Sequence, residues 1–184
     1  MRHRSLMTSL LTVGLVIGGG ITAISPAQAY GSLGCRWVNP AVQLNAPAPL
    51  LSAPAWGTAA STWSWLNASV TVSSSGSPDV YGTYELWGNT VTWSGVTRGK
   101  GTAASFPPCN GGNWVNGQME VVLNWSYVGS YSAAQRQGVA AHELGHALGL
   151  AHNPSSRAIL MYPDDSRTTS VPANDDRAGI NAIY

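Results

Sequence analysis

Three histidines near residue 150 form the pattern in this sequence that most clearly indicates chemistry. His142 and His146 are four residues apart, and Glu143 lies beside the first of them. On a helix, side chains with this spacing project from one face on adjacent turns, so both imidazoles can bind one metal ion. With His152 as a third ligand, they would leave one position of a zinc ion open, as in catalytic zinc sites. Glu143 could then hold a water molecule at that position and act as the general base.

The third histidine requires the helix to end early. In a continuous helix, His152 would lie about 15 Å along the axis from His142, too far to share an ion with ligands at about 2 Å. Gly149 supplies the end, because a residue without a Cβ adopts the left-handed conformation at little cost. An alternative is a helix whose histidines are merely packed or hydrogen-bonded. It is weakened because only His3 lies outside this cluster.

The elements around this motif can be predicted from apolar periodicity and capping signals. Ser132 and Gln135 fit a capping box, which predicts a helix from Ala133 through Leu148. An alternating pattern over Gln118–Trp125 predicts the clearest strand of the chain. Less regular patterns predict strands at 36–45, 70–72, 80–87, 89–96 and 99–106, a connector at 47–54, a helix at 56–67, and a closing helix from Asn174 with Ile180 and Ile183 on its inner side.

Residues 1–29 have the features of a secretory signal peptide. Two arginines precede an apolar run from Leu6 to Ile24, and Ala27 and Ala29 form an A-x-A cleavage site. We therefore expect a secreted, extracellular domain over residues 30–184. The alternative is a retained membrane anchor. A glycine triplet within the run, and the lack of stop-transfer charges after it, argue against that alternative.

Charge and composition restrict the partners. Removal of residues 1–29 takes away two arginines and no acid, which leaves seven basic and eight acidic side chains. Nucleic acid is therefore not expected as a partner. No later stretch could span a bilayer, so we expect no membrane contact after signal removal. We also expect the protein to be a monomer.

The two cysteines, Cys35 and Cys109, form an even count in an exported chain, and one disulfide is their simplest state. Two alternatives exist for Cys35. One is lipid acylation, which Ser32 disfavours because a leucine is expected at that position. The other is a thiolate that caps the zinc, which would leave Cys109 unpaired.

With the histidine motif and Met161 in view, the chain resembles the metzincin zinc endopeptidases, and within them the matrixins, as a small secreted member of bacterial type. Residues 158–163 (Ala-Ile-Leu-Met-Tyr-Pro) look like the Met-turn of that family. Residues 175–184 are similar to its final helix. Residues 101–108 (Gly-Thr-Ala-Ala-Ser-Phe-Pro-Pro) look like the edge strand that pairs with the substrate backbone.

The resemblance implies an α+β fold with a twisted, mostly parallel sheet, an antiparallel edge strand, an active-site helix and a C-terminal helix. It implies that residues 30–184 are a zinc metalloprotease catalytic domain whose substrates are proteins or peptides. Residues 164–173 would form one wall of a substrate pocket. The implied roles are zinc ligands for His142, His146 and His152, general base for Glu143, a floor under the metal for Met161, an anchor for its turn at Asp175 and Asp176, and a substrate-pairing edge at Thr102, Ala103 and Ala104.

The chain departs from the family pattern in its other metal sites. Matrixins usually carry further histidines for a structural zinc and clustered acids for calcium. Residues 30–141 contain no histidine and only three acids, Asp79, Glu85 and Glu120. We therefore expect one catalytic zinc ion, and the scarcity of acids disfavours calcium.

The predicted reaction is peptide-bond hydrolysis by a zinc-bound water, with Glu143 as the general base. Two alternatives remain open from the residues alone. One is a tryptophan-rich extracellular module that binds glycans or cell wall and holds a structural metal, since all eight tryptophans lie between residues 37 and 125. The other is hydrolysis of a non-peptide amide at the same site.

Overall fold

The computed structural model describes residues 30–46, 55–64, 66–73, 76–103 and 105–184. The predicted signal peptide, the connector at 47–54 and Ala104 lie outside these residues. Among the described residues, no helix is both long and apolar enough to cross a membrane.

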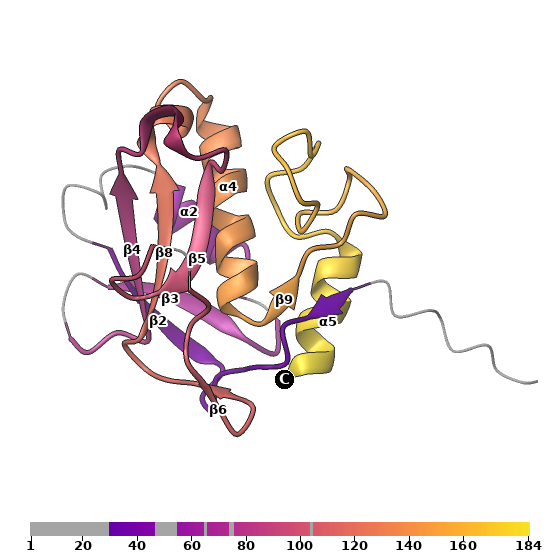
Figure 1. Ribbon diagram of the computed structural model, residues 1–184. Helices are drawn as coiled ribbons and strands as arrows, with labels where there is room; N and C mark the ends of the chain where they lie inside the picture. Colours follow the sequence, from indigo (N-terminus) through magenta and orange to yellow (C-terminus); the bar gives the residue numbers. More distant parts are fainter. Residues whose placement is uncertain (1–29, 47–54, 65, 74–75, 104) are drawn as a thin grey trace, which may run out of the picture.

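A five-stranded mixed sheet forms one layer of the fold, with strand order β3-β2-β4-β8-β5 (Figure 1). Its first four strands are parallel, and β5 pairs antiparallel with β8 at one edge. This is the α+β arrangement that the resemblance implies. The strands are β2 (Ala41–Asn45), β3 (Ser69–Ser73), β4 (Val80–Glu85), β5 (Gly95–Gly99) and β8 (Met119–Asn124).

Two helices, α2 and α4, pack together on one face of the sheet, where α2 contacts β3 and α4 contacts β5 and β8. The short strand β1 pairs antiparallel with β9 beyond the end of α4. The remaining elements are β1 (Gly31–Ser32), α2 (Ala55–Ser61), η1 (Gly88–Thr90), β6 (Cys109–Asn110), β7 (Asn113–Trp114), α3 (Trp125–Val128), α4 (Ala133–Ala147), β9 (Leu150–Ala151) and α5 (Asn174–Ile183).

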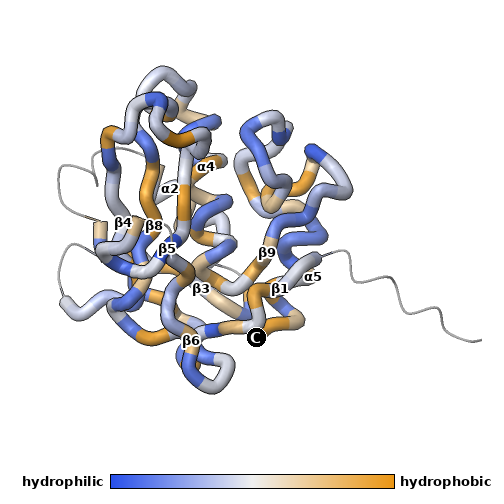
Figure 2. Tube along the Cα trace, viewed as in Figure 1, coloured by the Kyte–Doolittle hydropathy of each residue, from blue (hydrophilic) through white to orange (hydrophobic). Residues whose placement is uncertain are grey.

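The strand β8 lies in the interior, and hydrophobic residues mark much of its length (Figure 2). The sequence pattern predicts this strand correctly, but it suggests one apolar and one polar face. In the structure all six residues of β8 are buried, including Glu120 and Asn124. Both faces of β8 are therefore covered.

Two predicted strands are wrong. Residues 89–96 form η1 and a loop, and strand structure starts only at Gly95. In the segment 99–106 only Gly99 lies in a strand, as the last residue of β5, and the other described residues form none. The sheet edge is therefore β5, and Thr102 and Ala103 are not an edge strand. The reason is a turn after β5, where Gly101 has a φ of 72° and the Thr102 hydroxyl donates to the Gly99 carbonyl at 2.7 Å. The predicted helix at 56–67 is present as the shorter α2.

Cys35 and Cys109 form a disulfide, with their Cα atoms 6.2 Å apart. The bond joins the segment after β1 to the β6–β7 hairpin, 74 residues further along the chain. The predicted pairing is therefore confirmed.

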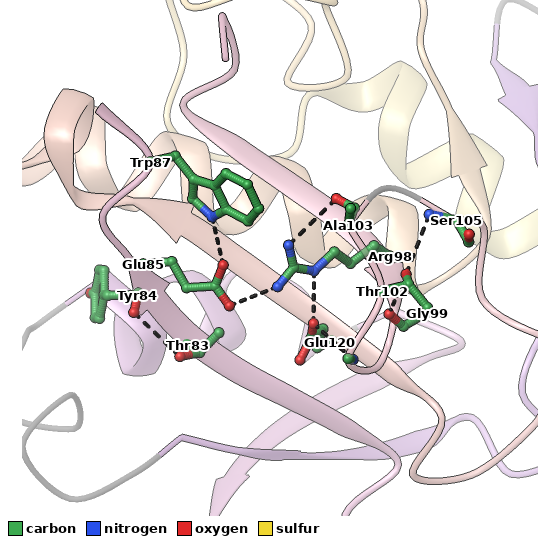
Figure 3. Close-up of polar contacts among 11 residues, drawn as sticks. Thr83, Tyr84, Glu85, Trp87, Arg98, Gly99, Thr102, Ala103, Ser105 and Glu120 are labelled. Atoms are coloured by element: carbon green, nitrogen blue, oxygen red, sulfur yellow. Dashed lines mark hydrogen bonds and ion pairs between the residues drawn. The ribbon is translucent and has the colours of Figure 1, made fainter. Parts of the chain in front are cut away.

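An ion network centred on Arg98 lies on the face of the sheet opposite the helices (Figure 3). Arg98 on β5 donates to Glu120 on β8 at 2.7 Å and to Glu85 on β4 at 2.6 Å. Glu85 also accepts from the indole N–H of Trp87 at 2.5 Å. The three charged residues share this face because side chains alternate along each strand. Arg98 therefore connects three adjacent strands, and it satisfies the carboxylate of the buried Glu120.

We expect Arg98→Met to lower the free energy of unfolding by about 3 kcal/mol, because it keeps side-chain length but leaves two carboxylates without their cation. Denaturant unfolding measures the loss. Lys100→Met is the matched control, since Lys100 lies exposed near the same strand end over the Tyr81 ring and should cost no more than about 1 kcal/mol. Equal stabilities for the two variants would contradict the importance of the network.

Candidate active site

The helix α4 begins and ends where the sequence predicts. The Ser132 hydroxyl accepts from the Gln135 amide, and the Gln135 side chain accepts from the Ser132 amide, which completes the capping box. After α4 ends at Ala147, Gly149 has a φ of 102° and reverses the chain. A Cβ at Gly149 would also collide with the Cys35 carbonyl oxygen. The reversal therefore needs glycine for two separate reasons.

The reversal brings the three histidines together. One ring nitrogen from each of His142, His146 and His152 lies within 4.8 Å of the others, and they are the only such cluster among the described residues. His142 and His146 each donate from Nδ1 to a backbone carbonyl, of Leu160 and Leu150 respectively, at 2.7 Å. Because carbonyls only accept, each of these rings keeps a lone pair on Nε2, and Nε2 of His142 lies 3.2 Å from Nε2 of His152.

Burial sets the charge state of these side chains. It lowers the pKa of His142 well below its ordinary value, and it lowers the pKa of His146 to about 4. Burial also lowers the pKa of His152. The imidazoles are therefore neutral near pH 7, which is the form that binds metal. Burial raises the pKa of Glu143 to about 7, while a hydrogen bond from Thr97 acts in the opposite direction.

Met161 is buried, with only 2% of its surface exposed. Its sulfur packs against Gly145, between the two histidines of α4, where any Cβ would overlap it. The absence of a side chain at Gly145 therefore lets the methionine approach the backbone of α4. This contact places Met161 beside the helix that carries two of the histidines, and its role as a floor under a metal stays a prediction.

The turn that contains Met161 is fixed by the start of α5. The carboxylate of Asp176 accepts from the amides of Leu160 and Met161 at 2.9 and 3.1 Å. Asp175 accepts from the side-chain amide of Asn153, the residue after His152, at 2.7 Å. The contacts of Asp176 agree with the predicted anchoring of this turn, whereas Asp175 contacts Asn153 instead of the turn itself.

An open cleft of about 680 Å³ lies over the histidines and Glu143. Residues of β5 line one side, and Asp164, Asp165 and Arg167 line another, within the wall expected at 164–173. Trp93, Phe106 and Trp114 add aromatic surface. The cleft therefore joins the histidine cluster to a free sheet edge.

Sequence reasoning missed the cleft residues Gly95, Val96 and Thr97, because it placed the edge strand further along the chain. Thr102 and Ala103 lie in the turn after β5 and are not among the residues that line the cleft. Phe106 and Pro107, from the same predicted segment, do line it. The only local signal for β5 is its Gly-Val-Thr start, which is too short to be decisive.

Four of the seven described tryptophans are interior. Trp37, Trp56, Trp63 and Trp114 are at most 5% exposed, whereas Trp87 and Trp93 are partly buried and Trp125 is exposed. Core packing therefore accounts for those four, which weakens the prediction of a glycan-stacking platform.

Comparison with known families agrees with this geometry. The family model described as matrixin matches residues 79–184, more than half of the chain. The chain belongs to the matrixin family. Its sheet order, its histidine cluster and its buried methionine fit the fold of these zinc metalloendopeptidases.

Three similar proteins come from three different organisms. Neutrophil collagenase of Homo sapiens is 52% identical over 50 residues, 25% of this matrixin and 10% of that protein. The hatching enzyme of Paracentrotus lividus is 36% identical over 108 residues, which are 56% of this chain and 16% of that protein. Karilysin of Tannerella forsythia is 38% identical over 82 residues, which are 44% of this chain and 17% of that protein. The matched segments thus cover less than a fifth of each of these relatives.

We expect Gly149→Ala to destabilise this matrixin by more than about 1 kcal/mol and to weaken zinc binding, because the left-handed backbone and the Cys35 carbonyl both exclude a Cβ. Thermal unfolding and zinc titration measure the two effects. Gly57→Ala is the control, since a Cβ there meets open space on α2, and it should stabilise by about 0.5 to 1 kcal/mol. Normal zinc affinity in Gly149→Ala would show that the reversal does not depend on glycine.

Proposed function

We propose that this protein is a secreted, zinc-dependent endopeptidase in which His142, His146 and His152 bind the metal and Glu143 is the general base. The observation that carries the proposal is the position of the histidine cluster, beside a buried carboxylate and at the floor of a cleft with a free sheet edge. Family membership supports the same class of reaction.

The residues present fit a catalytic zinc ion. Their ring nitrogens already lie within 4.8 Å of one another, and the two buried imidazoles are oriented by carbonyl acceptors behind them. Such acceptors fix the tautomer and the ring plane in zinc sites. When bound by these three imidazoles, zinc would lower the pKa of water and polarise the carbonyl of the scissile peptide.

The chain itself supplies the proton transfers. Glu143 is 5% exposed and lines the cleft, so its carboxylate can take a proton from the attacking water without competition from bulk solvent. The same carboxylate would then deliver that proton to the departing amine. A base that receives and returns one proton needs a fixed position beside both reacting atoms.

The outer edge of β5 would position the substrate. A peptide in the cleft can lie extended along Gly95–Thr97 and pair with the backbone as a further strand. Pairing through the backbone places no demand on substrate side chains. Selectivity would then come from the cleft walls, where aromatic residues and the 164–167 segment lie.

Export would explain two features of the chain. Residues 1–29 would act as the signal peptide, which leaves residues 30–184 as the catalytic domain. The disulfide between Cys35 and Cys109 suits an oxidising compartment.

The test is to incubate the mature chain with a peptide library, with and without a chelator, and to map the cuts. We expect cleavage that the chelator abolishes and added zinc restores. Glu143→Ala should retain one zinc ion per chain but lose at least about a thousandfold in rate, because the base is gone. Asp79→Ala removes a carboxylate at the start of β4, outside the cleft, and should cleave normally.

A zinc-loaded wild type that cuts no peptide would refute the proposal. Cleavage of small non-peptide amides, without cleavage of peptides, would show that the protein is an amide hydrolase of another substrate class. Glycan binding that is equal in wild type and Glu143→Ala, without cleavage, would favour a binding module instead.

A further inference from the structure

We propose that Thr97 is a positioning residue that fixes the carboxylate of Glu143 for proton transfer. This inference rests on the proposed function, because it assigns a role to a contact of the proposed base. Thr97 itself touches neither the metal ligands nor the reacting atoms in this proposal. It acts through Glu143.

A hydrogen bond between β5 and α4 joins Thr97 to Glu143, two residues that lie 46 positions apart in the sequence. The Thr97 hydroxyl on β5 lies 2.9 Å from Oε2 of Glu143 and donates to it. The same hydroxyl lies 2.8 Å from the backbone carbonyl of Glu143, so its single proton is shared between that oxygen and Oε2. Thr97 is therefore held against both ends of the glutamate, its carboxylate and its main chain.

The strand register explains why this side chain reaches the helix. Thr97 pairs with Val121 of β8, and its neighbour Arg98 pairs with Glu120. Because side chains alternate across a strand, Arg98 points to the ion network and Thr97 to α4. The network described above therefore also fixes which face of β5 carries the hydroxyl.

Gly95 leaves the space in which the Glu143 side chain lies. A Cβ at Gly95 would lie 2.8 Å from Cγ and 2.9 Å from Oε1 of Glu143, closer than such atoms approach. The carboxylate therefore fits between the bare backbone of Gly95 and the hydroxyl of Thr97. Oε2 accepts from Thr97, which leaves Oε1 as the oxygen available to the attacking water.

Orientation matters because a glutamate side chain has several rotatable bonds. A misplacement of about 1 Å in a reacting group can reduce a rate by about a hundredfold. Without the hydroxyl, the buried Oε2 would lose a hydrogen-bond partner and the carboxylate would turn toward another donor. The expected result is slower chemistry with unchanged substrate binding.

The experiment compares Thr97→Val, which keeps the shape but removes the hydroxyl, with Thr97→Ser, which keeps the hydroxyl. On a peptide that the wild type cleaves, we expect Thr97→Val to lower kcat by about 10- to 100-fold with little change in KM. Thr97→Ser should recover most of kcat. Zinc content and thermal unfolding are measured for each variant, and both should stay close to wild type.

A purely structural role would give a different pattern. It would lower stability or zinc content in Thr97→Val and reduce kcat in proportion to the folded, zinc-loaded fraction. That pattern, or a normal kcat in Thr97→Val, would overturn the inference. A wild type that cleaves nothing would instead refute the proposed function, which the peptide library tests separately.

A second readout does not depend on activity. Crystal structures of the metal-free Thr97→Val and Thr97→Ser variants would show the Glu143 carboxylate directly. We expect it rotated away from its wild-type position in Thr97→Val and unchanged in Thr97→Ser. An unchanged carboxylate in Thr97→Val would contradict the positioning role, whatever the protein cleaves.

Discussion

The left-handed turn at Gly149 is the constraint on which the site depends. It separates the two histidines of α4 from His152 by a reversal rather than by further helix, so three imidazoles converge. The reversal is held from outside as well. The Leu33 amide donates to the Gly149 carbonyl at 2.8 Å, and β1 pairs with β9. The N-terminal segment of the described chain is thus part of the support for the three histidines.

Aromatic side chains complete this support by satisfying carbonyls of α4. The indole N–H of Trp63 donates to Ala141, and that of Trp37 donates to Ala147. The Tyr184 hydroxyl donates to Leu148. Carbonyls in the last turn of a helix have no partner within the helix, so those of Ala147 and Leu148 need donors from elsewhere. Two of the many tryptophans in this chain therefore hold the helix that carries the histidines.

The sequence predicts the site where its signals are local and misses it where they are not. The histidine spacing, the capping box and the stop at Gly149 all lie between Ser132 and His152, and the structure agrees with each. The edge strand was misplaced because β5 is short and its position is set by distant partners. Arg98 pairs with Glu120 across the sheet, and Gly95 fits against α4. Neither contact produces a periodic pattern in the sequence. The contact between Thr97 and Glu143 could not be predicted from the sequence for the same reason.

The carboxylate of Asp176 ties the turn that contains Met161 to α5. A ribosome releases the chain from its N-terminus onward, so the histidine helix emerges well before α5 does. Until α5 docks, the Met161 turn lacks the acceptor that fixes its amides. The turn beside the histidine helix is therefore fixed only after α5 has been made and has docked, although the histidine helix itself precedes α5 in the chain.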